Sequence, residues 1–300
     1  MNLGMGPGVM RWTTGRVSAE TTETEMPYYS GDNNANNIDY SNNTYAPSAG
    51  WPAHQAWWQL LGLGGDDRII GSRWNDYIDG GDGSDALFGY TGNDSLYGRN
   101  GNDFLYGHDG DDNLNGGAGD DLLRGQGNSD WLSGDDGNDT LEGGPGDDTL
   151  IGGIGNDVNR GGSGNDVILD GAGNDILNGG TGDDRLWGGA GNDRYEFLEG
   201  GIDVVNDGVN EGGSPRTDAV YDTQDRIVVS YLSNEIELIR FQNSNDLWIT
   251  STTDFADETI DAGVKIEDYY LGGHYTVEFL QTADSMTFNI ANYAPTDNFI

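Results

Sequence analysis

Between residues 62 and 196, one aliphatic side chain recurs in every nine residues, with mostly polar residues and glycines between. The eighth position of this nine-residue phrase is Ile or Leu in thirteen of fifteen copies, the exceptions being Asn159 and Tyr195. We predict that positions seven to nine form a short strand, whose eighth side chain points inward while the seventh and ninth point outward. One aliphatic residue per nine makes a thin core, so each turn is expected to be stable only when it stacks on its neighbours.

The polar half of the phrase is rich in glycine and ends in aspartate. Three copies read GGDGSDALF, GGAGDDLLR and GGTGDDRLW, beginning at Gly80, Gly116 and Gly179. The glycines suit a sharp turn that visits positive φ and directs several carbonyl groups towards one point. The sixth position is Asp in every copy, and these fifteen residues are the candidate metal ligands: Asp67, Asp76, Asp85, Asp94, Asp103, Asp112, Asp121, Asp130, Asp139, Asp148, Asp157, Asp166, Asp175, Asp184 and Asp193.

Carbonyl and carboxylate oxygens in one turn predict a site for a hard cation. Calcium accepts about six to eight oxygen ligands in loose geometry, whereas magnesium demands a tight octahedron and keeps its waters. Zinc or copper would favour Cys or His, but the chain has no Cys and only His54, His108 and His274. The pattern GGxGxDxUx is itself typical of a calcium-binding parallel β-helix repeat.

With these motifs, the chain resembles the haemolysin-type calcium-binding (RTX) repeat proteins. The resemblance implies an all-β fold, a right-handed parallel β-roll in which two nonapeptides make one turn and copy n stacks on copy n+2. It also implies that each ion lies between stacked loops, which for seven plus six intervals gives about 13 calcium ions. Trp74 and Asn128 replace the fourth-position Gly and Asp170 replaces a first-position Gly, so these loops are expected to hold calcium poorly.

We divide the chain into an N-terminal arm or cap (1–61), the β-roll (62–196) and a C-terminal β-rich cap (197–300). Residues 31–39, GDNNANNID, look like a decayed copy with Asn in the Asp slot, which could cap the roll without binding metal. Residues 53–61, AHQAWWQLL, are predicted to form a short amphipathic helix over the first open turn.

The last third of the chain changes to ordinary strand patterning. Strands are predicted at residues 227–231, 235–241, 246–250, 263–270, 275–280 and 286–290. We expect this block to close the open edge of the roll, which would otherwise template aggregation. Asp203 keeps the phase of the repeats with a shift of one residue and is a further candidate ligand.

The net charge of −39 and pI of about 4.1 change which partners are plausible. Such a charge excludes nucleic acid, and calcium would relieve much of the repulsion that opposes compaction. No Sec signal and no apolar window long enough to span a membrane is visible, so a transmembrane segment is not expected. The resemblance implies type I secretion to the cell surface or medium, with an uncleaved C-terminal signal like the ending Asp297–Ile300.

No enzyme is predicted, because neither HExxH nor GxSxG occurs and the arm before the roll is too short for a catalytic domain. Three functions remain. The first, which we favour, is a secreted structural protein that folds on calcium and self-assembles. The others are a carbohydrate-binding or adhesive module with an acidic polysaccharide as partner, and a secretion and folding module of a partner enzyme.

Stacking of copy n on copy n+2 also places three apolar ninth-position side chains, Ile151, Leu169 and Trp187, in one outward-facing column. A soluble monomer rarely leaves such a patch bare. We therefore expect it to be buried by the chain's own termini or by a second subunit.

Overall fold

The computed structural model describes residues 9–11, 28–39, 58–197, 201–205, 226–229, 236–239, 247–251, 263–266, 279–281 and 287–289. The fold is all-β, and the described residues contain no helix, so none of them forms a helix that could cross a membrane. The chain divides into two compact units, Met1–Asp136 and Gly137–Ile300.

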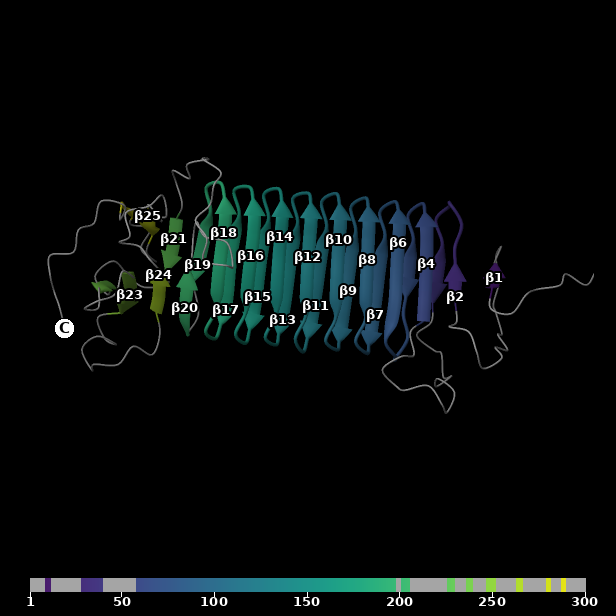
Figure 1. Cartoon of the computed structure of the whole chain (residues 1–300), viewed down its shortest axis with the longest axis horizontal. Coiled ribbons are helices and arrows are strands. Elements are labelled where there is room, and N and C mark those ends of the chain that lie inside the picture. The colour runs from purple at the N-terminus through teal and green to yellow at the C-terminus, as the bar shows by residue number, and fades with distance from the viewer. Residues whose placement is uncertain are drawn as a thin grey trace, which may run out of the picture. The chain divides into compact units, whose positions relative to one another are not determined.

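Two parallel sheets build the first unit (Figure 1). One has the order β1-β2-β4-β6-β8-β10-β12 and the other the order β3-β5-β7-β9-β11. The strands are β1 Val9–Arg11, β2 Tyr28–Ser30, β3 Asn37–Asp39, β4 Trp58–Gly64, β5 Arg68–Ile70, β6 Asp76–Asp82, β7 Ala86–Thr91, β8 Ser95–Asn100, β9 Phe104–Asp109, β10 Asn113–Ala118, β11 Leu122–Gly127 and β12 Trp131–Asp136.

The second unit has the same pattern of alternating strands and then changes it. Its sheets have the orders β14-β16-β18-β20-β24-β23-β22 and β13-β15-β17-β19-β21-β25-β26. The strands are β13 Thr140–Pro145, β14 Thr149–Ile154, β15 Val158–Ser163, β16 Val167–Ala172, β17 Ile176–Thr181, β18 Arg185–Ala190, β19 Arg194–Phe197, β20 Ile202–Val205, β21 Arg226–Val229, β22 Ile236–Ile239, β23 Leu247–Ser251, β24 Gly263–Ile266, β25 Phe279–Gln281 and β26 Thr287–Asn289.

Strands β21 to β24 and β26 fall within or at the edge of five predicted C-terminal segments and confirm a strand in each. Strand β25 overlaps the predicted segment 275–280 only at residues 279–280, and residues 275–278 lie outside the described residues. Strands β24 and β25 each pair in parallel with the roll, on β20 and β21. Strands β23 and β26 then pair antiparallel with β24 and β25, and β22 pairs antiparallel with β23. The parallel stack of the second unit thus ends in antiparallel strands, as expected of a block that follows the repeats.

The strand register confirms that copy n stacks on copy n+2. Leu114 in β10 pairs with Leu132 in β12, and Leu177 in β17 pairs with Tyr195 in β19, in each case the eighth position two copies further along. Two nonapeptides therefore make one turn. The step from β18 to β20 is one residue longer, because Leu186 pairs with Val205.

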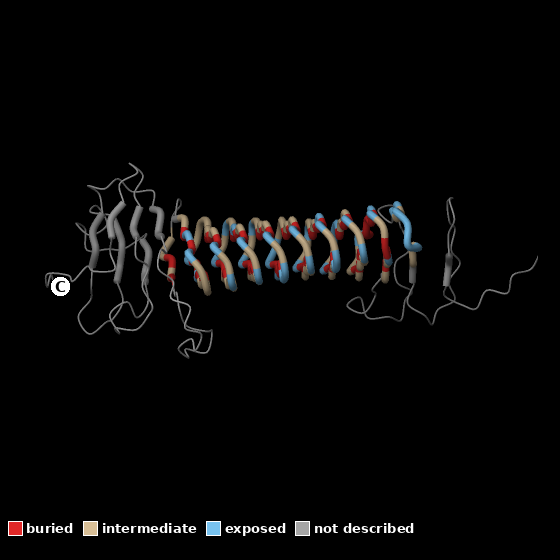
Figure 2. The backbone as a smooth tube through the Cα atoms, turned by 90° about the horizontal axis from the view of Figure 1, so that it is seen from above, coloured by how far each residue is buried: buried red, intermediate tan, exposed pale blue. Residues whose placement is uncertain are grey.

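The core of each unit is the column of eighth-position side chains. Every one of them, from Ile69 to Tyr195, is fully buried, and the seventh and ninth positions beside them are mostly half-buried or exposed. Figure 2 shows the buried residues recurring along each turn of the backbone. The two exceptions in the sequence pattern, Asn159 and Tyr195, occupy the same inward slot as the aliphatic residues.

The predicted helix over residues 53–61 is wrong in its second part. Residues 58–61 belong to strand β4, and Leu60 is buried and pairs with Ile78 in β6. An apolar run is ambiguous between helix and buried strand, and the free edge of β6 favours the strand. Residues 53–57 lie outside the described residues.

The decayed copy at residues 31–39 does stack on the roll. Strand β3 pairs in parallel with β5, and Ile38 lies opposite Ile69. Within the rest of the predicted arm, residues 9–11, 28–30 and 58–61 belong to β1, β2 and β4. The other arm residues and the C-terminal ending Asp297–Ile300 lie outside the described residues.

The apolar column has the predicted register, since Ile151 pairs with Leu169 and Leu169 with Trp187. All three side chains are half-buried in the single chain, so its described residues do not bury the patch, and burial by a second subunit stays a prediction. The physical reason is that side chains in one column shield one another along the strand-to-strand direction and leave their outer faces open.

Candidate metal centre

All sixteen candidate aspartates, from Asp67 to Asp203, are buried, with exposed fractions of at most 3%. Each stands at the end of a glycine turn and directly before or at the start of a strand. A buried carboxylate needs partners for both oxygens, because the desolvation of an unpaired charge is costly. The two oxygens have different surroundings.

The Oδ1 atoms form a hydrogen-bonded ladder along each column of turns. The backbone N–H of Asp85 donates to Asp103 Oδ1 at 2.7 Å, and that of Asp148 donates to Asp166 Oδ1 at 2.8 Å. The last described step, from Asp184 N–H to Asp203 Oδ1, measures 3.1 Å and spans 19 residues. Asp203 therefore takes the sixth-position role despite its shifted phase.

The Oδ2 atoms are buried and have no hydrogen-bond partner among the described residues in nine of these aspartates: Asp67, Asp85, Asp94, Asp103, Asp112, Asp157, Asp166, Asp175 and Asp184. Buried polar atoms in proteins are nearly always satisfied, so a repeated orphan in one position indicates a missing ligand.

Where the first position is glycine, that residue keeps the space beside Oδ2 open. A Cβ added at Gly98 would meet Asp103 Oδ2 and lie 2.6 Å from the carbonyl oxygen of Gly116, one turn further on. At Gly161 the same Cβ would meet Asp166 Oδ2 and lie 2.5 Å from the carbonyl oxygen of Gly179. Glycine thus allows a carboxylate and a carbonyl from two stacked loops to face one position.

The decayed copy shows what kind of group fits there. The Nδ2 of Asn36 donates to the carbonyl oxygens of Asn34 at 2.6 Å and Asp32 at 3.2 Å, and to Asp67 Oδ1 at 2.9 Å. It also lies 3.5 Å from the carbonyl oxygen of Gly62. A positively polarised amide group therefore stands in for a cation, surrounded by oxygen atoms of two stacked copies.

Burial makes these carboxyl groups hard to ionise in the calcium-free chain. Desolvation raises the pKa of Asp94 to about 9, with further repulsion from Asp76 and Asp112. Desolvation likewise raises the pKa of Asp85 and Asp112 to about 7. A bound cation would oppose both effects, since it offsets the lost solvation and screens the like charges.

The turns offer oxygen atoms as metal donors. His108, the one histidine within the described part of the chain, stacks instead on the rings of Phe88 and Tyr90. Carboxylates together with several carbonyls match the preference of calcium for many oxygens in flexible geometry. The residues present therefore fit a calcium ion between stacked turns.

Two of the three departures from the consensus have visible local consequences. In the Trp74 loop, the N–H of Ser72 donates to Asp76 Oδ2 at 2.5 Å and its hydroxyl donates to Asp76 Oδ1 at 3.2 Å. This carboxylate is already satisfied by its own loop, which supports the expectation of poor calcium binding there. Asn128 takes the fourth-position glycine's place at a φ of 77°, a conformation that Asn tolerates better than most residues.

A second ladder, which the sequence pattern did not lead us to predict, runs along the fifth position. The N–H of Asn93 donates to Asn75 Oδ1 at 3.0 Å, and the N–H of Asn165 donates to Asp147 Oδ1 at 2.8 Å, so these bonds run from the later copy to the earlier one. A signal was available, because this position is Asn or Asp in every copy except those with Ser84 and Ser129. The fifth-position side chains hold adjacent turns together on the exposed side.

The comparisons with known proteins agree with this geometry. The model of the RTX calcium-binding nonapeptide repeat matches in 4 copies, at residues 61–96, 88–123, 124–158 and 160–195. A comparison with curated proteins found no significant match.

Proposed function

Through residues 61–195 the chain belongs to the family of proteins built on the RTX calcium-binding nonapeptide repeat, and from that premise we propose that it is a secreted structural protein that folds on calcium. The observation that carries this proposal is the recurrence, along the columns of turns, of nine buried Oδ2 atoms that have no hydrogen-bond partner among the described residues. Such a column is unfavourable in the absence of cations and becomes a set of ligands in their presence.

The proposed ligands are the sixth-position aspartates and Asp203, together with backbone carbonyls of the stacked loops. Each step between stacked sixth-position aspartates offers one position, which gives the predicted figure of about 13 ions, and the step from Asp184 to Asp203 offers one more. The Asp76 position is the weakest candidate, because Ser72 already occupies both of its carboxylate oxygens.

Coupling of calcium to folding follows from charge and from the thin core. With a net charge of −39, the calcium-free chain repels itself and has few apolar residues with which to offset conformational entropy. Extracellular calcium modules bind at about 10⁻⁴ to 10⁻³ M, so such a chain stays unfolded inside a cell and folds outside. At free calcium tenfold above Kd, each site adds about 1.4 kcal/mol of stability.

Far-ultraviolet circular dichroism of the full chain, with millimolar calcium and with excess EGTA, tests this function. At pH 7.5 we expect the strand signal only with calcium. A strand spectrum that persists unchanged in EGTA contradicts the proposal.

Self-assembly is the finer part of the proposal. Its support is the half-buried column Ile151, Leu169 and Trp187, which a neighbouring copy could cover. Size-exclusion chromatography with light scattering should give a mass above 32.2 kDa in calcium. A monomer in calcium at all concentrations contradicts assembly but leaves calcium-driven folding intact.

A second candidate, a carbohydrate-binding module, is favoured by an aromatic row on strands β7 and β9. Phe88 and Tyr106 stack with ring centroids 5.3 Å apart, and Tyr90 and His108 stack at 5.3 Å. The Arg124 guanidinium lies 5.6 Å from the centroid of Tyr106. Flat aromatic faces beside a cation suit the rings and carboxylates of an acidic polysaccharide.

Retention on an alginate column in calcium tests this alternative. Tyr90→Ala, which removes an exposed ring, should weaken retention, whereas Ile154→Ala, an exposed apolar residue elsewhere, should not. No retention of the unaltered chain contradicts the alternative.

A further inference from the structure

Two residues that depart from the repeat consensus contact each other in the interior of the second unit. One is an Asn at the eighth position of its copy and the other is an Asp at the first position of another copy. Asn159 interrupts the aliphatic column between Leu141 and Leu177 and is fully buried. Its Nδ2 donates to Asp170 Oδ2 at 2.6 Å. Asp170 stands where a repeat normally has its first glycine, so each unusual residue has the other as its partner.

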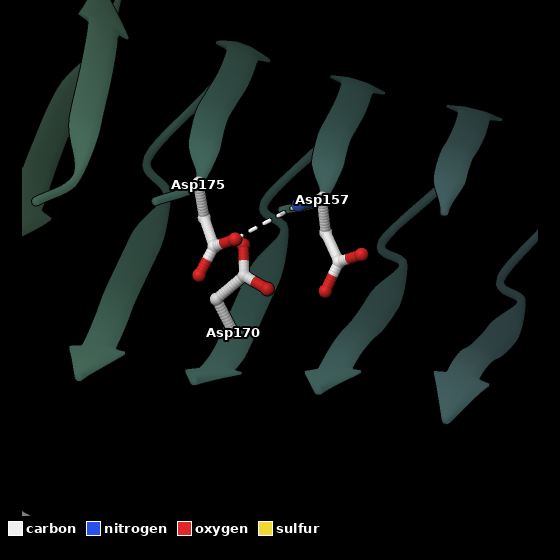
Figure 3. Close-up of side chains that lie close together, drawn as sticks. All are labelled: Asp157, Asp170 and Asp175. Atoms are coloured by element: carbon white, nitrogen blue, oxygen red, sulfur yellow. Dashed lines mark hydrogen bonds between the residues drawn. The ribbon is translucent and has the colours of Figure 1, made fainter. Parts of the chain in front are cut away.

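This pairing places a third carboxylate among two ladder aspartates (Figure 3). Asp157, Asp170 and Asp175 each direct one oxygen to a common position, and these oxygens lie within 4.8 Å of one another. The N–H of Asp157 still donates to Asp175 Oδ1 at 2.8 Å, so the ladder is intact around the additional side chain.

Four oxygen atoms of this cluster are buried and have no hydrogen-bond partner among the described residues: Asp157 Oδ2, Asn159 Oδ1, Asp170 Oδ1 and Asp175 Oδ2. Asp157 and Asp175 are each 1% exposed, and the carboxylate of Asp170 lies beside both of them in Figure 3. Asp170 Oδ1 itself lies where a Cβ of Gly152 would stand, next to Asp157 Oδ2. Orphan oxygens from three carboxylates and one amide point to a cation rather than to an internal hydrogen-bond network.

We propose that Asp157, Asp170 and Asp175, with Asn159 holding Asp170 in place, form a calcium site of a different class from the other repeat sites. The usual turn has a glycine at the position of Asp170, whereas this one adds a charged ligand. Calcium affinity rises with the number of charged ligands and with the rigidity of the site.

This site therefore binds calcium more tightly than the others and fills first, in place of the weak binding expected from the lost glycine alone. Filling first makes it the place where calcium-driven ordering of the second unit begins. The inference rests on the proposed function, in that it requires calcium binding by the repeats.

Calcium titration of the full chain by calorimetry is the first test. We expect one equivalent of calcium to bind in a phase separate from, and tighter than, the main phase. Asp170→Asn should weaken that phase by about tenfold or more, because one charged ligand is lost. Asp136→Asn, the same change on an exposed carboxylate, is the control and should leave the phase unchanged.

The double variant Asn159→Leu with Asp170→Gly distinguishes loss of the site from loss of folding, because it restores the repeat consensus at both positions and is therefore expected to fold. It should fold in calcium and lose the tight phase only. A direct measurement uses Eu³⁺ excitation spectra, whose line position depends on the number of charged ligands. The unaltered chain should show a minor line beside the main one, and both variants should lose it.

Each outcome separates this inference from the proposed function. If calcium binds in a single uniform phase, or if the tight phase and the minor Eu³⁺ line survive in Asp170→Asn, the three-carboxylate site is overturned while calcium-driven folding stands. If no calcium binds at all, the proposed function fails as well. If Asp170→Asn lowers the stability of the calcium-bound chain without weakening the tight phase, the cluster is structural and the inference is wrong.

Discussion

At the scale of the residue, the two oxygens of one carboxylate have separate roles. Oδ1 accepts the backbone N–H of the preceding turn, as between Asp85 and Asp103, and needs no metal for this. Oδ2 has no such partner and faces the carbonyl of a glycine one turn on. An Asn side chain keeps the acceptor oxygen but puts a donor in place of Oδ2, and the Nδ2 of Asn36 accordingly donates to a carbonyl oxygen of its own turn.

Asp103→Asn should therefore separate the two roles. We expect the variant to bind fewer calcium ions but to keep most of its stability in saturating calcium, because Asn Oδ1 still accepts the N–H of Asp85. Equilibrium dialysis gives the ion count, and urea denaturation in saturating calcium gives the stability. Asp103→Ala is the matched comparison and should lose both; an unchanged ion count in Asp103→Asn contradicts the assignment of Oδ2.

At the scale of the element, each strand contributes one aliphatic side chain to a column that runs through the unit. Leu105 in β9 pairs with Leu87 on one side and Leu123 on the other, and all three are fully buried. Because a turn has little other apolar material with which to fill a gap, the column tolerates truncation poorly.

Leu105→Ala should destabilise the calcium-bound chain by about 2–5 kcal/mol, the usual cost of such a cavity. The neighbouring Phe104 is 48% exposed, so Phe104→Ala should change stability by only about 0.5 kcal/mol or less. Urea denaturation in saturating calcium measures both. Equal losses for the two variants would show that the eighth position is not the core of the strand.

At the scale of the whole molecule, calcium and protons compete for the same carboxylates. In the folded, calcium-free chain, burial raises the pKa of Asp112 to about 7 and that of Asp94 to about 9, from 3.8. Between the ordinary pKa and these raised values, the folded state holds protons that the unfolded state has released. The stability that these protons contribute to the calcium-free fold is therefore fully present below about pH 4 and is lost as the pH rises through 7 to 9.

We expect the calcium-free chain to show more strand signal at pH 4.5 than at pH 7.5, in buffers stripped of calcium. Calcium should restore the signal at pH 7.5, and its apparent affinity should fall as the pH is lowered. Circular dichroism against pH, with and without calcium, checks both points. A calcium-free fold that gains stability as the pH rises would contradict the raised pKa values.

Much of the fold of this protein could be predicted from the sequence, because one nine-residue pattern recurs along the chain. A phrase of nine residues with Asp at the sixth position and Leu or Ile at the eighth determines the strands, the inward column and the oxygen chemistry of the turns. The stacking of alternate copies then required only the resemblance to a known repeat. The residue types within one copy and the number of copies were sufficient to predict the roll, since each turn contacts only its neighbours.

Only the tertiary structure decided those features of the fold that depart from the nine-residue repeat. Residues 58–61 form a strand because the edge of β6 offers hydrogen bonds, which an apolar run by itself does not reveal. Asn159 and Asp170 read as two unrelated defects, 11 residues apart, until stacking brings them together at 2.6 Å. Their meeting depends on which side chains of adjacent turns share one interior point, and that is a property of the folded chain rather than of the repeat.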